Sequence, residues 1–84
     1  MTATQLKGRI EELAPGTTAE LIDLTGTQDH WQAIVVSPAF EGMLMVERHR
    51  MVYALLDKEI KSDQVHALTL KTFTPAQYEK TQKA

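Results

Sequence analysis

The chain has 84 residues, a formal net charge of −2 and no cysteine, which fits one small domain without disulfides. No apolar run reaches the length of a membrane span, and the first residues lack the basic and apolar regions of a signal peptide. Acidic and basic residues are interspersed, so the broad basic face that is typical of nucleic-acid binders is not indicated. We therefore expect a single cytoplasmic domain over residues 1–84.

The first half of the chain predicts one helix and two strands. The helix is indicated by apolar residues at helical spacing, a threonine cap and a Pro-Gly end: Leu6, Ile10, Leu13, Thr4 and Pro15-Gly16. Residues 18–25 and 31–37 are typical of strands, and the short glycine-containing connection between them predicts an antiparallel hairpin. Because residues 33–36 are apolar without alternation, we expect the second strand to be central and covered on much of both faces.

The second half predicts a long helix, a third strand and a short final helix. A turn over residues 37–42 leads into the helix, about residues 43–60. The residues expected to line its core-facing side are Met45, His49, Val52, Leu56 and Ile60. Residues 66–72 form the third strand, and Thr74-Pro75-Ala76-Gln77 has the pattern of a helix N-terminus that opens a helix over about residues 75–82. The order α-β-β-α-β-α predicts an α+β domain with a three-stranded mixed sheet.

The connections between the strands bring two histidines together. The second and third strands are joined through a long helix, which is the crossover expected of a parallel pair. His30 lies just before the second strand and His66 opens the third, so we expect both at the same end of the sheet. Neutral imidazole is the commonest protein ligand for metals, and two such ligands are too few for a closed site. The pattern indicates half of a metal site.

Four residues are expected to have structural roles. Phe40 anchors the turn before the long helix, and Gly42 supplies a backbone conformation at the helix entry. His49 falls within the apolar stripe, where a hydrogen-bonded core histidine is expected, and Pro75 takes the first position of the last helix. No serine lies in a nucleophile motif and no glycine-rich phosphate loop is found, so enzyme activity is not expected.

Taken together and in order, four short motifs resemble the signature of the BolA-like family. They are Phe40-x-Gly42, Arg48-His49-Arg50-Met51-Val52, His66-Ala67-Leu68 and Thr72-Phe73-Thr74-Pro75. The resemblance covers residues 4 to about 79 and implies a small α+β fold similar to class II KH domains.

This resemblance implies partnership with a monothiol glutaredoxin in iron–sulfur cluster handling. A [2Fe–2S] cluster would bridge the two proteins, with the glutaredoxin supplying its active-site cysteine and a bound glutathione thiolate. The family's histidine ligand at the start of the last strand maps onto His66, and its second ligand, in the loop between the first two strands, maps onto His30. Because this chain has no cysteine, it would hold such a cluster only with ligands from a partner. A homodimer of the free protein is left open.

Three basic residues are expected to contact a partner, namely Arg48, Arg50 and Lys71. The same residues serve an alternative function, that of a nucleic-acid-binding transcriptional regulator with a KH-like fold. KH domains grip the nucleic-acid backbone with a G-x-x-G loop, and Gly26 is not followed by a second glycine at that spacing. A third alternative is a protein-interaction module without any cofactor.

Overall fold

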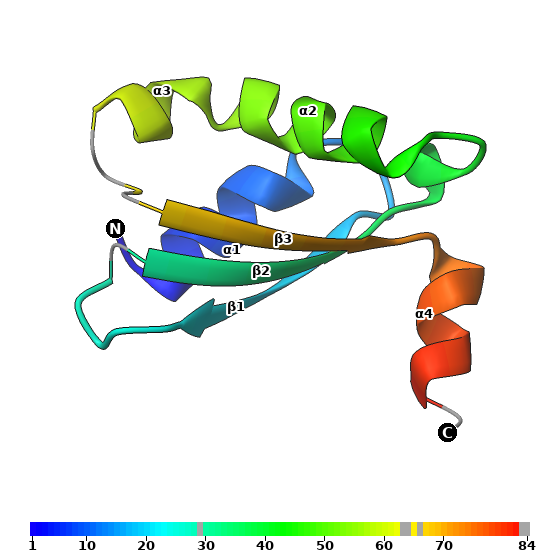
Figure 1. Ribbon diagram of the computed structural model, residues 1–84, viewed down its shortest axis with the longest axis horizontal. Helices are drawn as coiled ribbons and strands as arrows, with labels where there is room; N and C mark the ends of the chain where they lie inside the picture. The colour runs from blue at the N-terminus through cyan, green and yellow to red at the C-terminus, as the bar shows by residue number, and fades with distance from the viewer. Residues whose placement is uncertain (29, 63–64, 66, 83–84) are drawn as a thin grey trace.

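The computed structural model describes residues 1–28, 30–62, 65 and 67–82, and its strands form one mixed sheet (Figure 1). The elements, in chain order, are α1 (Ala3–Glu11), β1 (Thr18–Asp23), β2 (His30–Val36), the 3-10 helix η1 (Pro38–Phe40), α2 (Met45–Leu55), α3 (Asp57–Lys61), β3 (Ala67–Phe73) and α4 (Pro75–Gln82). The predicted α+β fold with a three-stranded mixed sheet is confirmed. Within the described ranges, no helix combines the length and apolar content that crossing a membrane requires.

The sheet has the strand order β1-β2-β3. β1 and β2 are antiparallel, with Asp23 opposite Trp31, as their short connection predicts. β2 and β3 are parallel, with His30 opposite Ala67 and Val36 opposite Phe73. The crossover prediction is therefore confirmed, and β2 and β3 begin at the same end of the sheet.

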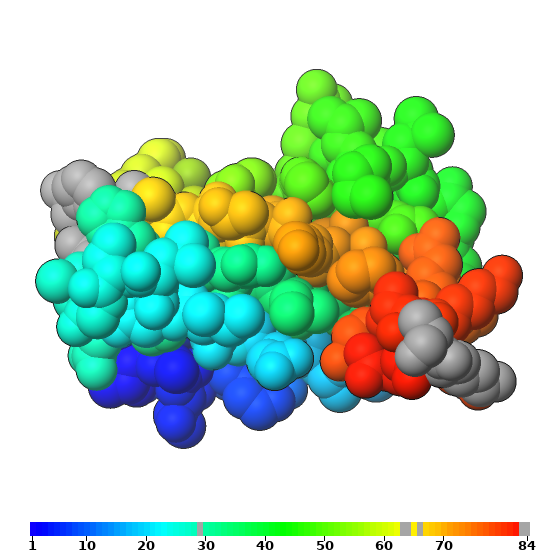
Figure 2. Space-filling view, turned by 60° about the horizontal axis from the view of Figure 1, so that its bottom comes forward, coloured from blue at the N-terminus to red at the C-terminus, as the bar shows by residue number. Residues whose placement is uncertain are grey.

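One face of the sheet carries the hydrophobic core. Along β2 the side chains of Trp31, Ala33 and Val35 are buried and alternate with half-buried neighbours. The buried residues contributed by α1, η1, α2 and the segment leading into β3 pack on this face: Leu6, Ile10, Phe40, Val52, Leu56 and Val65. The opposite face is only partly covered, and Figure 2 shows β3, β2 and β1 side by side there in orange, green and cyan. The prediction that β2 is the central strand is confirmed, and its residues are buried on the core face and half-buried on the other.

Helix α1 begins two residues earlier than predicted and contacts the backbone of β1. The cap is Thr2 rather than Thr4, because Thr2 Oγ1 accepts from Gln5 N–H at 3.2 Å while Thr2 N–H donates to Gln5 Oε1 at 2.9 Å. Two side chains of α1 form hydrogen bonds with the backbone of Ala19, the second residue of β1. Lys7 Nζ donates to the Ala19 carbonyl at 3.2 Å, and the Ala19 N–H donates to Glu11 Oε2 at 3.3 Å.

The predicted continuous helix over residues 43–60 is divided into α2 and α3 at Leu56. Arg9 of α1 reaches this point and donates from Nη2 to the carbonyl of Leu55 at 2.9 Å. A side chain that inserts into the hydrogen-bond ladder is a common cause of a helix break. Arg9 Nε also donates to Glu59 Oε1 at 2.5 Å, so the same guanidinium holds both sides of the break.

The ion pair with Arg9 explains how Glu59 is accommodated in α3. The Glu59 side chain is only 8% exposed, and its hydrogen bond from Arg9 lowers the pKa of the carboxyl group despite the opposing effect of burial. The hydrogen bond to Glu59 likewise raises the pKa of Arg9. The carboxylate is therefore kept ionised at the edge of the core.

The core-facing side of α2 and α3 also differs from the predicted stripe. Val52 and Leu56 are buried as predicted, whereas Met45 is 55% exposed and His49 is half-buried. Two charged residues that the predicted stripe does not include are buried instead, Arg48 and Glu59. Each has internal hydrogen-bond partners, and Glu59 is in addition paired with the opposite charge of Arg9.

Candidate functional site

His30 is the first residue of β2 and its backbone is fixed from both sides. Its carbonyl accepts a hydrogen bond from Leu24 N–H at 2.9 Å, and the parallel register sets it opposite Ala67. The side chain is half-buried. His66, the other predicted ligand, lies outside the described residues, but it directly precedes Ala67 in the sequence. His30 therefore lies at the end of the sheet where the prediction located it.

The loop that leads to His30 is organised by the side chain of Asp23. Its carboxylate accepts backbone N–H groups from Thr25 at 3.3 Å, Gly26 at 3.0 Å and Gln28 at 3.1 Å. Gly26 and Gln28 both have a positive φ, 77° and 60° respectively, so the chain turns sharply at two points. Aspartate commonly bonds to the backbone that follows it in this way. These bonds organise the backbone of residues 25–28, just after β1.

The donor chemistry at this end is that of imidazole. The part of the chain that the structure describes holds no group of three or more histidine, aspartate or glutamate side chains arranged to bind a metal ion. An imidazole nitrogen is a known ligand of iron in [2Fe–2S] clusters, so His30 fits such a group as one ligand of a shared set.

Arg48 is buried rather than exposed on the flank of α2. Only 6% of the residue is exposed, and its guanidinium stacks over the Phe40 ring at 5.7 Å from the ring centroid. Nε donates to the Met43 carbonyl at 3.2 Å and Nη1 donates to Gln77 Oε1 at 2.9 Å. The same Gln77 oxygen accepts from Thr74 N–H at 3.0 Å, which completes the capping box of α4. The local sequence predicts this cap, but it gives no signal that Gln77 also binds Arg48.

The three basic residues expected to contact a partner do not share one surface. Arg50 is exposed on α2, and α2 packs over the covered face of the sheet. Lys71 is exposed on β3 opposite Ile34, on the face that the helices leave open. With Arg48 buried, these residues form no common basic patch.

The residues expected to be structural lie around the start of α2 and α4. Phe40 is fully buried, Gly42 has a φ of 75°, and Pro75 is the first residue of α4. His49 is the exception, because its buried Nε2 has no hydrogen-bond partner among the described residues. The hydrogen bond expected for a core histidine is thus not found at that nitrogen.

Comparison with known proteins gives a consistent result. A sequence model of the BolA-like protein family matches residues 12–77. The acid stress protein IbaG of Escherichia coli K12 is 32% identical over 62 residues, which cover 74% of this chain and 74% of that protein. BolA-like protein 1 of Bos taurus is 43% identical over 53 residues, which span 63% of this chain but only 38% of the bovine protein.

The fold also has a close match among solved structures. The structure of a bolA protein homologue from Coxiella burnetii superimposes with a TM-score of 0.76 at 39% sequence identity. The match covers 94% of this chain and 97% of that one.

Proposed function

Because the chain belongs to the BolA-like protein family, we propose that it is a non-catalytic cytoplasmic adaptor that binds a monothiol glutaredoxin and shares a [2Fe–2S] cluster with it. The observation that carries the proposal is the parallel register of β2 and β3, which sets His30 opposite Ala67, the neighbour of His66 in the sequence. Two imidazoles from adjacent strand starts would then serve one iron atom. The Asp23 carboxylate supports the proposal because it organises the backbone of residues 25–28 beside the start of β2.

The ligand count makes a partner necessary in this proposal. A [2Fe–2S] cluster takes four protein or cofactor ligands, and this chain has no thiol to offer. The glutaredoxin cysteine and glutathione would supply the two thiolates, while His30 and His66 supply two nitrogens. When bound in this way, the cluster would supply one-electron redox chemistry, at a higher potential than with four thiolates. An imidazole must be neutral to bind iron, so cluster sharing would weaken as the pH falls below the histidine range.

The test is to mix the protein with a cluster-loaded monothiol glutaredoxin and record visible absorption and circular dichroism. We expect wild type to change both spectra and to form a 1:1 heterodimer, and we expect His66→Ala and His30→Ala to abolish or alter the spectral change. The matched control is His49→Ala, which removes a histidine from α2 and should behave as wild type. Spectra that stay the same with wild type, or that change equally in all variants, would reject cluster sharing.

Of the alternatives, the nucleic-acid-binding function is less well supported. Arg48 is buried, and the exposed Arg50 and Lys71 lie on different sides of the molecule. Phosphate contacts give an affinity that falls steeply with salt, so a titration with duplex DNA across a range of salt concentrations tests this function directly. Measuring iron in the co-purified heterodimer separates cluster sharing from a simple protein-interaction module.

A further inference from the structure

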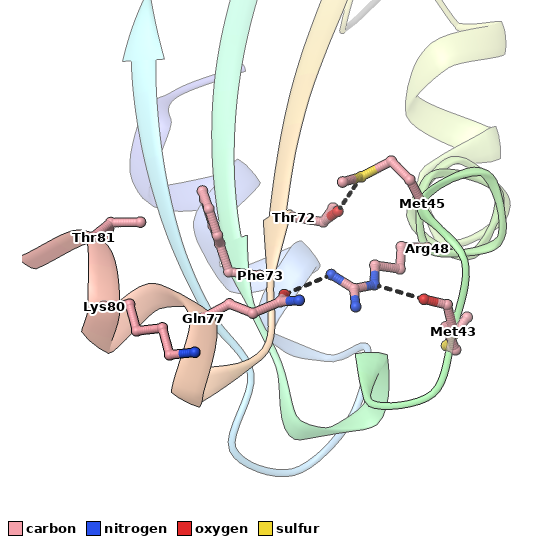
Figure 3. Close-up of a pocket in the computed structure, with 8 residues that line it drawn as sticks. All are labelled: Met43, Met45, Arg48, Thr72, Phe73, Gln77, Lys80 and Thr81. Atoms are coloured by element: carbon pink, nitrogen blue, oxygen red, sulfur yellow. Dashed lines mark hydrogen bonds between the residues drawn. The ribbon is translucent and has the colours of Figure 1, made fainter.

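A pocket lies at the end of the sheet opposite His30, between the start of α2, the end of β3 and helix α4 (Figure 3). Its volume is about 420 Å³, within the range of small-molecule sites. β2 separates the two ends, since His30 is its first residue and Val36, its last, pairs with Phe73 in the pocket wall. Seven strand residues span about 20 Å, so the pocket is distinct from the candidate cluster site.

The pocket holds a buried cation without a counter-ion. Both hydrogen bonds of Arg48 go to neutral oxygens, the Met43 carbonyl and the Gln77 amide. Among the ion pairs of the described residues none involves Arg48, and none of its hydrogen bonds there uses Nη2. Arginine is rarely buried to this extent unless it is paired with an anion. The guanidinium therefore retains donors and positive charge for an anionic group.

A second cation strengthens this preference. Lys80 of α4 lines the same pocket and is exposed, and none of the described residues that line it is acidic. Figure 3 shows Lys80 and Gln77 on the α4 side, with Arg48 extending toward them from α2. The lining is thus positively charged.

The remaining walls are apolar and adaptable. Met43, Met45 and Phe73 form them, and Thr72 Oγ1 donates to Met45 Sδ at 3.1 Å, which holds this half-exposed methionine at the pocket. Methionine side chains adjust to irregular apolar ligands. A hydrocarbon body is therefore favoured beside the charged head.

We propose that this pocket binds a small anionic amphiphile. Its carboxylate pairs with Arg48 and Lys80, and its hydrocarbon lies against Met43, Met45 and Phe73. A nucleic-acid phosphate fits less well, because the pocket beyond Arg48 and Lys80 is lined largely by the apolar side chains of Met43, Met45 and Phe73. The proposal does not depend on cluster binding.

The experiment is a titration of the full chain with decanoate below its critical micelle concentration, followed by NMR and calorimetry. We expect saturable 1:1 binding that shifts the signals of Arg48 Nε–H and of the Met43 and Met45 methyl groups. Decanol has the same tail without the charge and should bind roughly tenfold more weakly or worse, because a charge-assisted bond is lost. Lys80→Met should weaken decanoate binding about two- to fivefold, since it removes an exposed ion pair.

Two variants serve as controls. Lys58→Met removes an exposed lysine of α3 outside the pocket, and His30→Ala alters the other end of the sheet. Both should bind decanoate as wild type does, which separates this site from the proposed function. Arg48→Met should lose most of the affinity; if that variant does not fold, the comparison of decanoate with decanol and the Lys80→Met result decide. The proposal is overturned if decanoate shows no saturable binding, if decanol binds equally well, or if the shifts map outside the pocket.

Discussion

Gln77 joins two parts of the fold through one side-chain oxygen. Its Oε1 accepts hydrogen bonds from Arg48 Nη1 at 2.9 Å and from Thr74 N–H at 3.0 Å. Gln77→Met keeps the length and helix propensity of the side chain but removes this oxygen. We therefore expect this substitution to cost more than the loss of a helix cap.

The size of the effect follows from these two bonds. A helix cap contributes about 1 kcal/mol, and a hydrogen bond to a charged group about 1.5–3 kcal/mol. Because both bonds end on one oxygen and their contributions are not independent, the lower part of the sum applies, about 2.5–3 kcal/mol. For a domain of this size each kcal/mol lowers Tm by about 4–8 °C, so the expected decrease is roughly 10–24 °C.

The assay is urea unfolding followed by far-UV circular dichroism, with Thr74→Ala as the matched control. Thr74→Ala removes the reciprocal cap bond, Gln77 N–H to Thr74 Oγ1 at 3.2 Å, and leaves Arg48 paired. It should cost about 1 kcal/mol. Equal losses for the two variants would refute the reasoning, as would strict additivity of Gln77→Met with Arg48→Met, since residues in contact are expected to couple.

Three further predictions concern the core, the backbone and the loss of stability at acidic pH. Leu56→Ala, at the fully buried junction of α2 and α3, should lower the free energy of unfolding by about 2–5 kcal/mol in urea; a loss well under 1 kcal/mol would contradict its placement. Gly8→Ala should stabilise the interior of α1 by about 0.5–1 kcal/mol. Gly42→Ala should destabilise the protein by about 1–2 kcal/mol, because residue 42 has a φ of +75°, although there is open space around its Cβ. Changes in Tm of the same sign for the two variants would count against this argument from backbone conformation. The hydrogen bond from Arg9 lowers the pKa of Glu59 below its ordinary 4.5, so its stabilising contribution is complete above that value and is lost as the pH falls through the lowered pKa. The Glu59→Gln variant should therefore be less stable than wild type at neutral pH and should lose less stability on acidification. If its stability falls with decreasing pH in the same way as that of wild type, this role of Glu59 is excluded.

Local patterns and chain connectivity predict much of this fold. The Thr74–Gln77 signature correctly predicts the start of α4, and the helical connection between β2 and β3 correctly predicts their parallel pairing. His30 follows from the same argument, because the start of a strand is visible in the hydrophobic pattern. These features depend on residues close together in the sequence or on the order of elements.

The features that the sequence does not reveal depend on distant partners. The break between α2 and α3 involves Arg9, which is 46 residues away from Leu55, and no proline or glycine marks it. Arg48 looks like a flank residue because its buried position depends on Gln77, 29 residues further along the chain. A charged residue in an amphipathic pattern is assigned to the surface unless its partner is known. The pocket at α4 therefore becomes visible only in three dimensions.

The contacts of α1 with the backbone of Ala19 have a consequence for how copies of this protein can associate. An outer strand with unoccupied backbone groups offers a template for another strand, and Lys7 and Glu11 already take up both groups of Ala19 on β1. Strand addition at that side would have to displace them, and addition at β3 would have to displace Tyr53, whose hydroxyl donates to the Leu68 carbonyl at 2.9 Å. Pairing through one edge per molecule ends with two chains, whereas pairing through both edges continues into a fibre. Side chains from α1 and α2 thus occupy backbone groups on each outer strand, which disfavours edge-to-edge growth.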